Sequence, residues 1–368
     1  MSERVTIFIL IPWFHPAYKA GGPIQSIANM VKELENEDFM IVCGNKDIDG
    51  SILEVEFDKW RQFERCQVWY AKDHFPTKAI KPADILFING IYSWRFTLKP
   101  LLFSKAKRKI ISARGMLHPG ALGIKRFKKK VYLLAWKVLG MPRRFEFHAS
   151  NEIEKHFIQD IFGKSCVIHV ASNFPRMFEK RIPIEKVVGK ITLASIALIS
   201  PMKNYLLVLQ ALKECPHQVI YHIYGPVKDR DYWESCLELI SNMPSNVSIQ
   251  YHRDIPPGEV AASLYNCHVV ILPSRSENYG HSILEGLSSG RPVITSKNTP
   301  WNELTAANAG INVEETETDI LSAVNFFAAM DDSEYTKWSD GAGRYARNKV
   351  NIDTIRKEYK SMFEFAAP

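Results

Sequence analysis

The sequence lacks several features that would assign it to a familiar class. Its six cysteines are scattered, without a CxxC pair or a zinc-type spacing, so we expect buried free thiols in a reducing compartment. No apolar run reaches about 18 residues, the length that a spanning helix needs. The stretch "VTIFILI" (5–11) is too short to span and carries no cleavage site, so it predicts a β-strand. We find no internal repeat and no low-complexity tract.

The composition is typical of an ordinary globular protein, 46% hydrophobic and 24% charged. At about 150 residues per domain, 368 residues predict two domains. Lys and Arg exceed Asp and Glu by 47 − 40 = 7. A moderate positive charge is compatible with nucleic acid, an anionic membrane or an anionic substrate, and its distribution along the chain discriminates better than the total.

Short apolar runs alternate with helical patterns along the whole chain, which indicates βαβ units and parallel sheets. One series ends with "CVIHVASNFP" (166–175), and a second begins at "KITLASIALI" (190–199). We therefore predict an α/β protein with two doubly wound Rossmann-like domains facing across a cleft. The expected parts are an N-terminal domain (1–174), a linker (175–189), a C-terminal domain (190–345) and a C-terminal helix (346–368) that packs back on the N-terminal domain.

The stretch "SRSENYGHSILEGLSSG" (274–290) places two acids around a predicted helix start. Glu277 lies in a loop after a buried strand, and Glu285 lies on the helix. The amides near Gly280 to Ser282 would carry the partial positive charge of a helix N-terminus. From Gly280 to Glu285 is about 7 Å along the axis, roughly the reach of a diphosphate. The alternative is a capping Glu277 and a solvated Glu285.

Residues around this stretch resemble the retaining GT-B glycosyltransferases of family 4, also called glycosyl transferases group 1. The resemblance rests on "HIYGP" (222–226), "LPSRSENYGHSILEGLSSGRPVITS" (272–296) and "TPWNEL" (299–304). The N-terminal half agrees through "AGGPIQSIANMV" (20–31), "ARGMLHPGAL" (113–122), "FHASNEIE" (147–154) and "SNFP" (172–175). The likeness thus covers nearly the whole chain and implies the GT-B fold. It also implies that residues 1–174 form the acceptor-side domain and that residues 190–345 bind the nucleotide sugar.

The resemblance implies roles for individual residues. Glu277 would contact the donor sugar, Glu285 the nucleotide ribose, and Lys203 the phosphates. Leu198 stands where the family has an Arg, so one phosphate-neutralising charge is missing, and Arg114 or Lys228 would have to compensate. The remaining donor-binding positions are Gly21, Gly22, Gly225, Asn278, Tyr279, Gly280, His281 and Ser282.

A second departure from the family lies in the N-terminal half. Many members carry a His after the fourth strand, where this chain has Arg114, and Asn89 similarly replaces a His of some relatives. Arg114 is permanently charged and cannot act as a base, so it suits a phosphate. His118 lies close in sequence and is the remaining candidate for a catalytic histidine, although structural or solvent-facing histidines are more frequent.

The implied activity is transfer of a hexose, with retention, from a nucleotide diphosphate sugar to a hydroxyl. The family pattern needs no metal or other cofactor, and no DxD cluster flanks a strand end in this chain. Base recognition is expected near His252 to Ile255. A nucleotide-sugar epimerase and a catalytically silent nucleotide-sugar-binding protein remain alternatives. A dehydrogenase is disfavoured because GxGxxG is absent after the first strand.

Residues 105–144 hold 13 Lys and Arg and no Asp or Glu. Within them "IKRFKKKVYLLAWKVL" (124–139) predicts a helix with Phe127, Val131, Leu134, Ala135 and Val138 on one face. A basic amphipathic helix with aromatic residues suits an anionic membrane surface, whereas we find no nucleic-acid module. We expect a peripheral protein on the cytoplasmic face of the membrane, with a saccharide or lipid-linked saccharide acceptor in cell-surface polysaccharide or lipopolysaccharide synthesis. A core-packed helix with a solvated basic face is the alternative.

Overall fold

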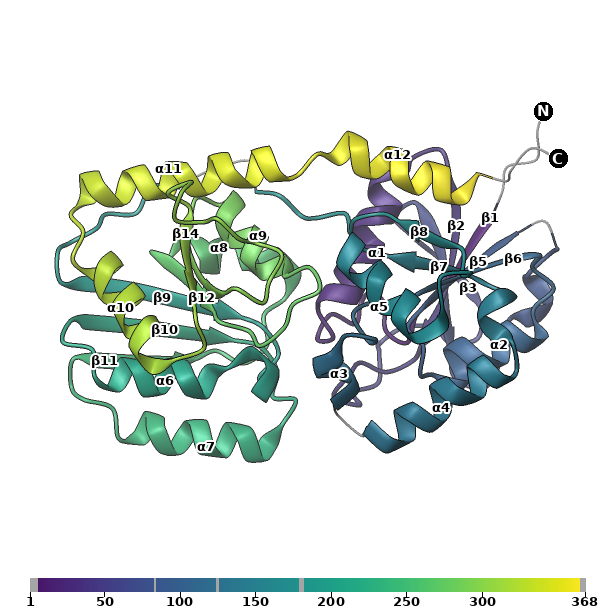
Figure 1. The fold of residues 1–368 in the computed structure, drawn as a ribbon, viewed down its shortest axis with the longest axis horizontal. Coiled ribbons are helices and arrows are strands. Elements are labelled where there is room, and N and C mark those ends of the chain that lie inside the picture. Colours follow the sequence, from purple (N-terminus) through teal and green to yellow (C-terminus); the bar gives the residue numbers. More distant parts are fainter. Residues whose placement is uncertain (1–5, 83, 124–125, 179–181, 365–368) are drawn as a thin grey trace. The chain divides into compact units, whose positions relative to one another are not determined.

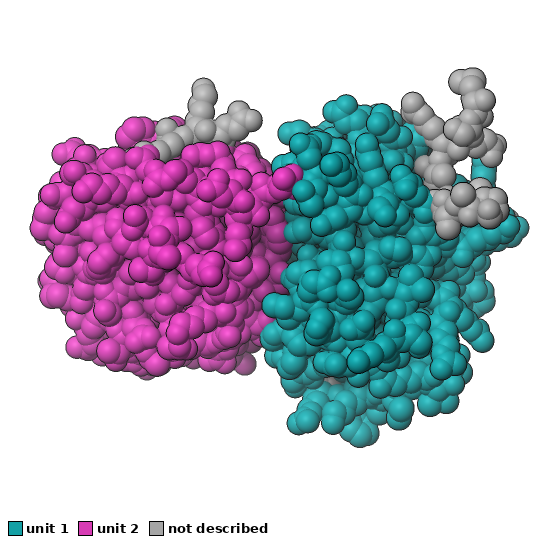
Figure 2. All heavy atoms as spheres, turned by 45° about the horizontal axis from the view of Figure 1, so that its top comes forward, with its two compact units in different colours: residues 1–174, 352–368 teal, residues 175–351 magenta. Residues whose placement is uncertain are grey.

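The computed structural model describes residues 6–82, 84–123, 126–178 and 182–364. The chain forms two compact units (Figure 2): unit 1 comprises residues 1–174 and 352–368, and unit 2 comprises residues 175–351. Residues 124–125 of the expected basic helix, 179–181 of the expected linker and 365–368 of the expected C-terminal helix lie outside the described residues.

Unit 1 is built on an eight-stranded sheet in the order β3-β4-β2-β1-β5-β6-β7-β8 (Figure 1). Its strands are β1 (Thr6–Leu10), β2 (Asp38–Gly44), β3 (Trp60–Phe63), β4 (Cys66–Ala71), β5 (Ile85–Asn89), β6 (Arg108–Ser112), β7 (Glu146–Ala149) and β8 (Ile168–Val170). Neighbouring strands are parallel except β3 and β4, which form an antiparallel pair at one edge. The parallel arrangement follows the βαβ alternation of the sequence.

The helices of unit 1 are α1 (Gly22–Glu33), α2 (Lys99–Phe103), α3 (Pro119–Gly123), α4 (Arg126–Val138), α5 (Glu152–Phe162) and α12 (Ile352–Phe363). Asn151 begins α5, because its side chain accepts from the backbone N–H of Glu154. The preceding Ser150 donates its hydroxyl to the Glu154 carboxylate at 2.9 Å.

Helix α12 packs within unit 1, although it follows unit 2 in the chain. Its Phe363 ring meets Phe87 of β5 edge to face, and Arg356 forms an ion pair with Glu33 of α1 at 3.0 Å. Arg108 of β6 donates to the carbonyls of Met362 and Glu364, which satisfies oxygens at the end of the helix. These contacts combine burial with helix capping, and together they hold α12 on unit 1.

Unit 2 has a six-stranded parallel sheet in the order β11-β10-β9-β12-β13-β14. Its strands are β9 (Lys190–Ile196), β10 (Gln218–Tyr224), β11 (Val247–Tyr251), β12 (Val269–Leu272), β13 (Val293–Ser296) and β14 (Gly310–Val313). Its helices are α6 (Tyr205–Lys213), α7 (Arg230–Ser241), α8 (Val260–Tyr265), α9 (His281–Ser288), α10 (Glu317–Ala328) and α11 (Asp332–Lys349). Residues 346–349 thus end α11, and the C-terminal helix begins at Ile352.

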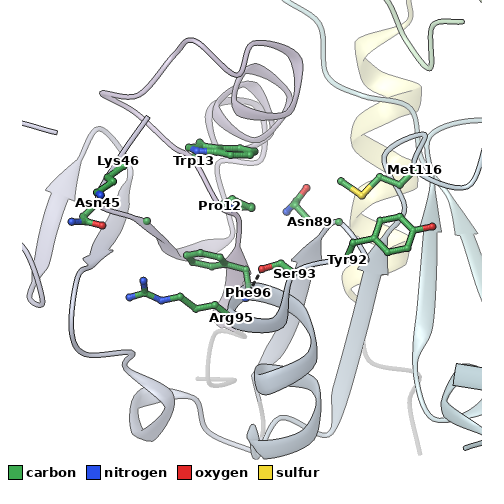
Figure 3. Close-up of a pocket in the computed structure, with 12 residues that line it drawn as sticks. Pro12, Trp13, Asn45, Lys46, Asn89, Tyr92, Ser93, Arg95, Phe96 and Met116 are labelled. Carbon is green, nitrogen blue, oxygen red and sulfur yellow. Dashed lines mark hydrogen bonds between the residues drawn. The ribbon is translucent and has the colours of Figure 1, made fainter. Parts of the chain in front are cut away.

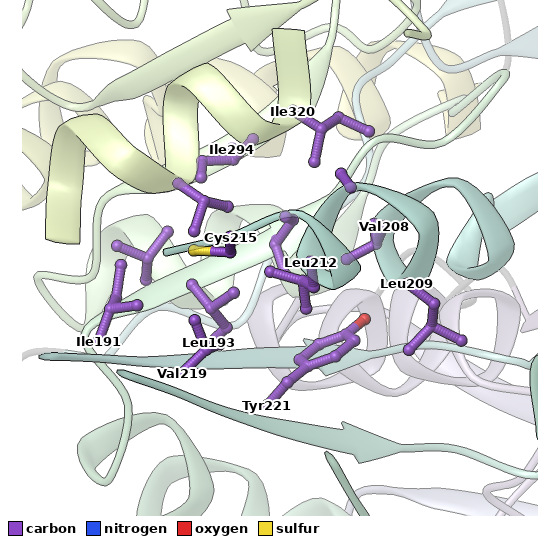
Figure 4. Packing of buried hydrophobic residues seen from close by; sticks show 14 of the residues in the cluster. Ile191, Leu193, Val208, Leu209, Leu212, Cys215, Val219, Tyr221, Ile294 and Ile320 are labelled. Atoms are coloured by element: carbon purple, nitrogen blue, oxygen red, sulfur yellow. The ribbon is translucent and has the colours of Figure 1, made fainter. Parts of the chain in front are cut away.

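Helices cover both faces of the unit 2 sheet, because successive strand residues point to opposite sides. In β12, Val269 and Ile271 join a core with α6, α7 and α10, part of which Figure 4 shows. Val270 and Leu272 join a second core with α8, α9 and α11. This strict alternation between two buried layers defines a doubly wound sheet. The cysteines agree with the sequence prediction, since all six are free and buried.

Each sheet reverses its winding beside its first strand. In unit 2 the reversal lies between β9 and β12, and in unit 1 it lies between β1 and β5. In open α/β sheets ligands bind beyond the carboxyl ends of the strands at such a reversal. The residues that follow β9 and β12, and those that follow β1 and β5, are therefore the first places to look for a site.

Candidate functional site

Lys203 and Glu277 lie at the winding reversal of unit 2. Lys203 ends the 3₁₀ turn Pro201–Lys203 that follows β9, and Glu277 lies in the loop that follows β12. The Lys203 Nζ contacts Glu277 Oε1, and the Ser274 hydroxyl donates to the same oxygen at 2.9 Å. The Glu277 N–H donates to the Asn298 carbonyl at 3.1 Å, which fixes the loop. Sequence reasoning selected Lys203 and Glu277 separately. In the structure their side chains form an ion pair.

The N-terminus of α9 follows Glu277 directly. Gly280 takes a left-handed conformation (φ 76°) and begins the helix, and its carbonyl accepts from the N–H groups of Ile283 and Leu284. A Cβ on Gly280 would lie 3.2 Å from the Trp301 indole nitrogen, which itself donates to the Tyr279 carbonyl at 2.5 Å. Glycine and Trp301 therefore shape this turn together. Glu277 is not the cap of α9.

The predicted residues of this turn differ in burial. Tyr279 and Gly280 are buried, whereas Asn278, His281 and Ser282 are partly exposed. The Tyr279 ring lies against those of His281 and Trp301. His281 and Ser282 are the first two residues of α9, so their N–H groups belong to the first turn, where backbone donors lack acceptors within the helix.

Glu285 lies one turn further along α9 and is only 3% exposed, so the alternative of a solvated helix residue is wrong. Arg176 Nε donates to Glu285 Oε1 at 2.9 Å, and a second guanidinium nitrogen lies 2.6 Å from the same oxygen. Arg176 also donates to the Pro257 carbonyl at 2.7 Å. Sequence reasoning missed Arg176, because it lies 109 positions from its partner and among residues that we assigned to a linker.

Gly225 follows β10 at the same edge of the sheet. A Cβ there would lie 1.9 Å from the Ala197 carbonyl oxygen, so no other residue fits without moving the backbone. Beside it, His252 stacks on Tyr224 with ring centres 4.6 Å apart and shares a 2.9 Å hydrogen bond with His222. Burial and the neighbouring His252 lower the pKa of His222.

Leu198 lies just beyond β9, half-buried, where the resemblance expects an Arg. The Lys228 N–H donates to the carbonyl of the adjacent Ile199 at 3.0 Å, so Lys228 belongs to the same strand-end region. The Arg275 N–H donates to the Met202 carbonyl at 2.9 Å, next to Lys203. Two exposed cations therefore lie close in the fold to the position of the missing charge, and sequence reasoning identified only Lys228.

The predicted glycines of unit 1 lie at the start of α1. Gly21 has a positive φ of 69° and precedes the helix, with no heavy atom within 4 Å of the position of a Cβ. Gly22 is the first residue of α1, and its carbonyl accepts from the Ser26 hydroxyl at 2.9 Å. The helix start is therefore open on the Gly21 side.

Arg114 has a positive φ of 50° just beyond β6. Its Nε donates to Asn89 Oδ1 at 2.9 Å, and its Nη1 contacts Asn173 Oδ1. The two positions where relatives carry histidines are thus hydrogen-bonded to each other. The neighbouring Gly115 N–H donates to the buried carboxylate of Glu154 at 2.5 Å, which holds this turn in place.

His118 forms hydrogen bonds within the turn that precedes α3. The Gly120 N–H donates to its Nδ1 at 3.1 Å, its ring packs edge to face on Phe157, and the Leu122 N–H donates to its carbonyl. Burial lowers the pKa of His118. These contacts give the side chain a local structural role in unit 1.

A cavity of about 480 Å³ opens in unit 1 (Figure 3). It lies beyond the carboxyl ends of β1, β2 and β5, at the winding reversal of this sheet. The cavity is lined by Pro12, Trp13, Gly44, Asn45, Lys46, Asn89, Gly90, Tyr92, Ser93, Arg95, Phe96 and Met116. Three aromatic rings and one methionine, together with polar side chains such as Lys46 and Asn89, are typical of a pocket for a small organic ligand.

Comparison with known proteins bears most directly on unit 2. Residues 177–342 match the family model of glycosyl transferases group 1. This range lies entirely within unit 2 and includes Lys203, Glu277 and Glu285. No curated protein sequence matches the chain.

Solved structures match nearly the whole chain. Anabaena Alr3699/HepE in complex with UDP and glucose is 14% identical, with 98% of this chain and 99% of that chain covered and a TM-score of 0.67. The sucrose-phosphate synthase of Thermosynechococcus elongatus is 12% identical over 98% of both chains, with a TM-score of 0.74. WaaG, a glycosyltransferase involved in lipopolysaccharide biosynthesis, is 12% identical over 98% of this chain and 100% of that chain, with a TM-score of 0.69. The chain has the GT-B fold. The two Rossmann-like units confirm the α/β fold class predicted from the sequence.

Proposed function

We propose that this protein is a glycosyltransferase that moves a hexose, with retention, from a nucleotide diphosphate sugar to a hydroxyl of a saccharide acceptor. The contact between Lys203 and Glu277 beside the start of α9 carries the proposal. It joins a cation for the diphosphate to an acid for the sugar hydroxyls at a winding reversal, where such sheets bind ligands. The match of residues 177–342 to a glycosyltransferase model supports the same assignment.

In this proposal the polar groups beside the start of α9 each have a role. Lys203 has three N–H donors, so it can keep Glu277 and also bind a phosphate oxygen. The first N–H groups of α9 add fixed partial positive charge where the leaving diphosphate becomes more negative. Glu285 would accept from ribose hydroxyls, with Arg176 fixing its orientation from the other side.

The proposed chemistry relies on electrostatic stabilisation of the leaving group. As the bond between the anomeric carbon and the phosphate oxygen breaks, the diphosphate takes the electron pair and can accept the proton of the attacking hydroxyl. Fixed N–H groups and Lys203 stabilise that charge without reorganisation. We propose that neither a metal nor another cofactor is needed, and that treatment with a chelator leaves the rate unchanged.

The test is release of nucleoside diphosphate from a panel of nucleotide diphosphate sugars, with hexose acceptors present. We expect turnover with one donor class, a product that keeps the anomeric configuration, and a loss of about 100- to 1000-fold in kcat for Glu277→Gln. Glu314→Gln is the matched control, because Glu314 pairs with Lys297 on the surface of the same unit. Unchanged turnover in Glu277→Gln would refute the assignment of Glu277.

A catalytically silent nucleotide-sugar-binding protein is the second candidate, and Leu198 is the observation that favours it. The same panel separates the two. A silent protein would be stabilised against heat by one nucleotide diphosphate sugar and would release no nucleoside diphosphate. An epimerase would instead convert the donor sugar without an acceptor.

We further propose that α4 binds an anionic membrane surface, which would bring the protein to a lipid-linked acceptor on the cytoplasmic side. Phe127, Val131, Leu134 and Val138 recur at helical spacing and are 80%, 52%, 60% and 78% exposed. The buried residues of α4 are Leu133 and Trp136, which belong to the unit 1 core. The predicted apolar face therefore points outward, so the core-packed alternative is wrong for this face.

Charge favours a membrane as the occupant of this face. Arg126, Lys128, Lys130 and Lys137 are exposed along α4, and its described residues include no acid. None of the described helices is long and apolar enough to cross a membrane. An apolar stripe flanked by basic residues suits the headgroup boundary of an anionic bilayer. The likeness to WaaG supports a place in cell-surface polysaccharide synthesis.

Co-sedimentation of the full chain with vesicles tests this surface. We expect binding to vesicles of phosphatidylcholine and phosphatidylglycerol at low salt, and much weaker binding to phosphatidylcholine alone. Replacing Lys130 and Lys137 by Gln should weaken binding about 30-fold, at about 1 kcal/mol per charge. Replacing Phe127 and Val138 by Ser should also weaken it, whereas Ile153→Ser, at an exposed position of α5, is the control. Wild-type protein that stays in the supernatant with anionic vesicles would contradict the proposal.

A further inference from the structure

In unit 2 the turn that follows β9 and the loop that follows β12 lie against each other, beside the start of α9. The Asn204 side chain donates to the Pro273 carbonyl at 3.3 Å at one end of this contact. At the other end Lys203 meets the Glu277 carboxylate. The residues between these two contacts are therefore held at the place where we propose that the diphosphate binds.

Arg275 lies in the middle of this contact. Its N–H donates to the Met202 carbonyl at 2.9 Å, so its backbone is held beside the turn that carries Lys203. Its side chain is 57% exposed, and its Nε lies 3.8 Å from Glu315 Oε2. At this distance the two charges form an ion pair without a hydrogen bond, and exposed ion pairs of this kind are weak. The guanidinium can therefore change its partner at little cost.

Glu315, which follows β14, does not depend on Arg275 for its position. The Asn298 side chain donates to its Oε1 at 2.8 Å, and the Asn204 side chain donates to its Oε2 at 3.4 Å. The Asn298 carbonyl in turn accepts from the Glu277 N–H at 3.1 Å. Two amides from neighbouring strand ends would thus keep the carboxylate in place when the arginine leaves it.

The pair of Lys203 and Glu277 adds no net positive charge to this region, because each charge offsets the other. A phosphate group carries more than one negative charge near neutral pH, so a further cation would stabilise a bound diphosphate. Arg275 is placed to supply that charge, since its backbone meets the turn of Lys203. The backbone of Lys228 instead meets the chain earlier, at Ile199.

We propose that Arg275 is a phosphate-binding residue that exchanges the Glu315 carboxylate for phosphate oxygens of a nucleoside diphosphate. The planar guanidinium can bind two phosphate oxygens at once, which makes a stronger contact than its present ion pair. Glu315 keeps the cation near the site before the ligand arrives and then competes with the ligand for it. The inference rests on the proposed donor site, because it takes the ligand from that proposal.

Calorimetric titration of the full chain with UDP, GDP, ADP and CDP tests this exchange. Arg275→Gln should weaken binding of the preferred diphosphate about 5-fold, and this loss should shrink with added salt. Glu315→Gln should have the opposite effect and tighten binding about 2- to 3-fold, because it removes the competing charge. Lys213→Gln and Glu214→Gln are matched controls, since both residues are exposed at the far end of α6.

The double variant separates the exchange from a merely structural role. In the Arg275→Gln protein, Glu315→Gln should change the affinity much less, because no guanidinium remains to be released. A carboxylate that only shaped the loops would instead weaken binding in both proteins when it is replaced. Arg275→Lys, which keeps the charge without the planar group, should recover part of the affinity.

The inference is overturned if no nucleoside diphosphate binds, if Arg275→Gln binds like wild type, or if Glu315→Gln has the same effect with and without Arg275. Release of nucleoside diphosphate from nucleotide sugars is measured separately. Turnover by the wild-type protein would leave the proposed transfer standing when this inference fails. The expected pattern of binding without any turnover would instead count against the transfer alone.

Discussion

Both sheets reverse their winding beside their first strand, yet the polar groups near the two reversals differ in whether the structure already supplies them with partners. In unit 2 the acids near the reversal already have cations: Lys203 contacts Glu277, and Arg176 pairs with Glu285. In unit 1, Asn89 lines the cavity, and its Nδ2 has no acceptor among the described residues.

This difference predicts two modes of binding. A ligand of unit 2 has to share or exchange partners that are present before it arrives, so charge-changing substitutions should alter affinity and rate together. A ligand of unit 1 meets a donor whose orientation is already fixed, so it loses little to reorganisation. The same topology can thus hold a site built on ion pairs and a cavity with a fixed amide donor.

Among single substitutions near neutral pH, the largest loss of stability should come from changing a buried carboxylate, and we compare one from each unit, Glu154 and Glu285. Glu154 of unit 1 accepts from three donors, the N–H groups of Gly115 and Ser150 and the Ser150 hydroxyl, at 2.5, 2.7 and 2.9 Å. In Glu154→Gln an NH₂ group would face one of these backbone N–H groups, so we expect a loss of about 2–3 kcal/mol. Glu285→Gln keeps an oxygen for Arg176, whose side chain is partly exposed, and should cost about 1 kcal/mol.

Urea unfolding of the two variants measures this order. Glu238→Gln, on the exposed side of α7, is the control for the chemical change. Glu285→Gln should additionally weaken nucleotide binding, which Glu154→Gln should leave intact in the remaining folded protein. We expect the larger loss in Glu154→Gln because Glu154 accepts from uncharged N–H and O–H groups through both carboxylate oxygens. Equal losses of stability in the two variants would contradict this expectation.

The second effect is a dependence of stability on pH, with one buried histidine in each unit. Burial, and then the charge of Arg114, lower the pKa of His148 to about 3, and burial lowers the pKa of His268 to about 4. In the unfolded chain both histidines have a pKa of about 6.5. Below that pH the unfolded chain therefore binds more protons than the folded one. Stability should be complete above about pH 6.5 and fall by about 1.4 kcal/mol per pH unit and histidine down to the folded pKa.

Unfolding by urea between pH 4.5 and 7.5 checks the sign and the slope. His148→Gln and His268→Gln should each flatten the slope, because glutamine does not titrate. His156→Gln, at an exposed position of α5, should not. Two variants that lose stability but keep the wild-type slope would show that other groups take up the protons.

Sequence predicted unit 2 better than unit 1 for a physical reason. Glu277, Gly280 and Glu285 lie on one loop and helix, so their spacing along the chain fixes their geometry. The Arg114 contacts join residues 25 and 59 positions away, and Arg176 meets Glu285 across 109 positions. No local pattern encodes such contacts, because they depend on which strand ends become neighbours in the sheet.

Helix α4 shows a different limit of sequence reasoning. Helical periodicity correctly placed Phe127, Val131, Leu134 and Val138 on one face. It fixes the angles between side chains but not which face turns toward the sheet. The core instead takes Trp136 and Leu133, from other positions on the helix.

The smallest expected effect tests the missing charge of unit 2. Leu198→Arg would restore a cation beyond β9, near Lys203, and should tighten binding of a nucleoside diphosphate about 5-fold, or about 1 kcal/mol, through a charge-assisted contact. The gain in affinity should shrink with added salt. Leu198→Gln, which adds a polar group without charge, should leave the affinity unchanged. Calorimetric titration measures the affinity of both variants.

The contrary outcome has its own meaning. If Leu198→Arg does not tighten binding while Lys228→Gln weakens it, then Lys228 already supplies the charge, since it shares the strand-end region through Ile199. In that case the reversal of unit 2 is an ionic site with its cation moved to a neighbouring strand end. Its contrast with the unit 1 cavity, where the buried donor of Asn89 carries no charge, is then sharper than the sequence at Leu198 implies.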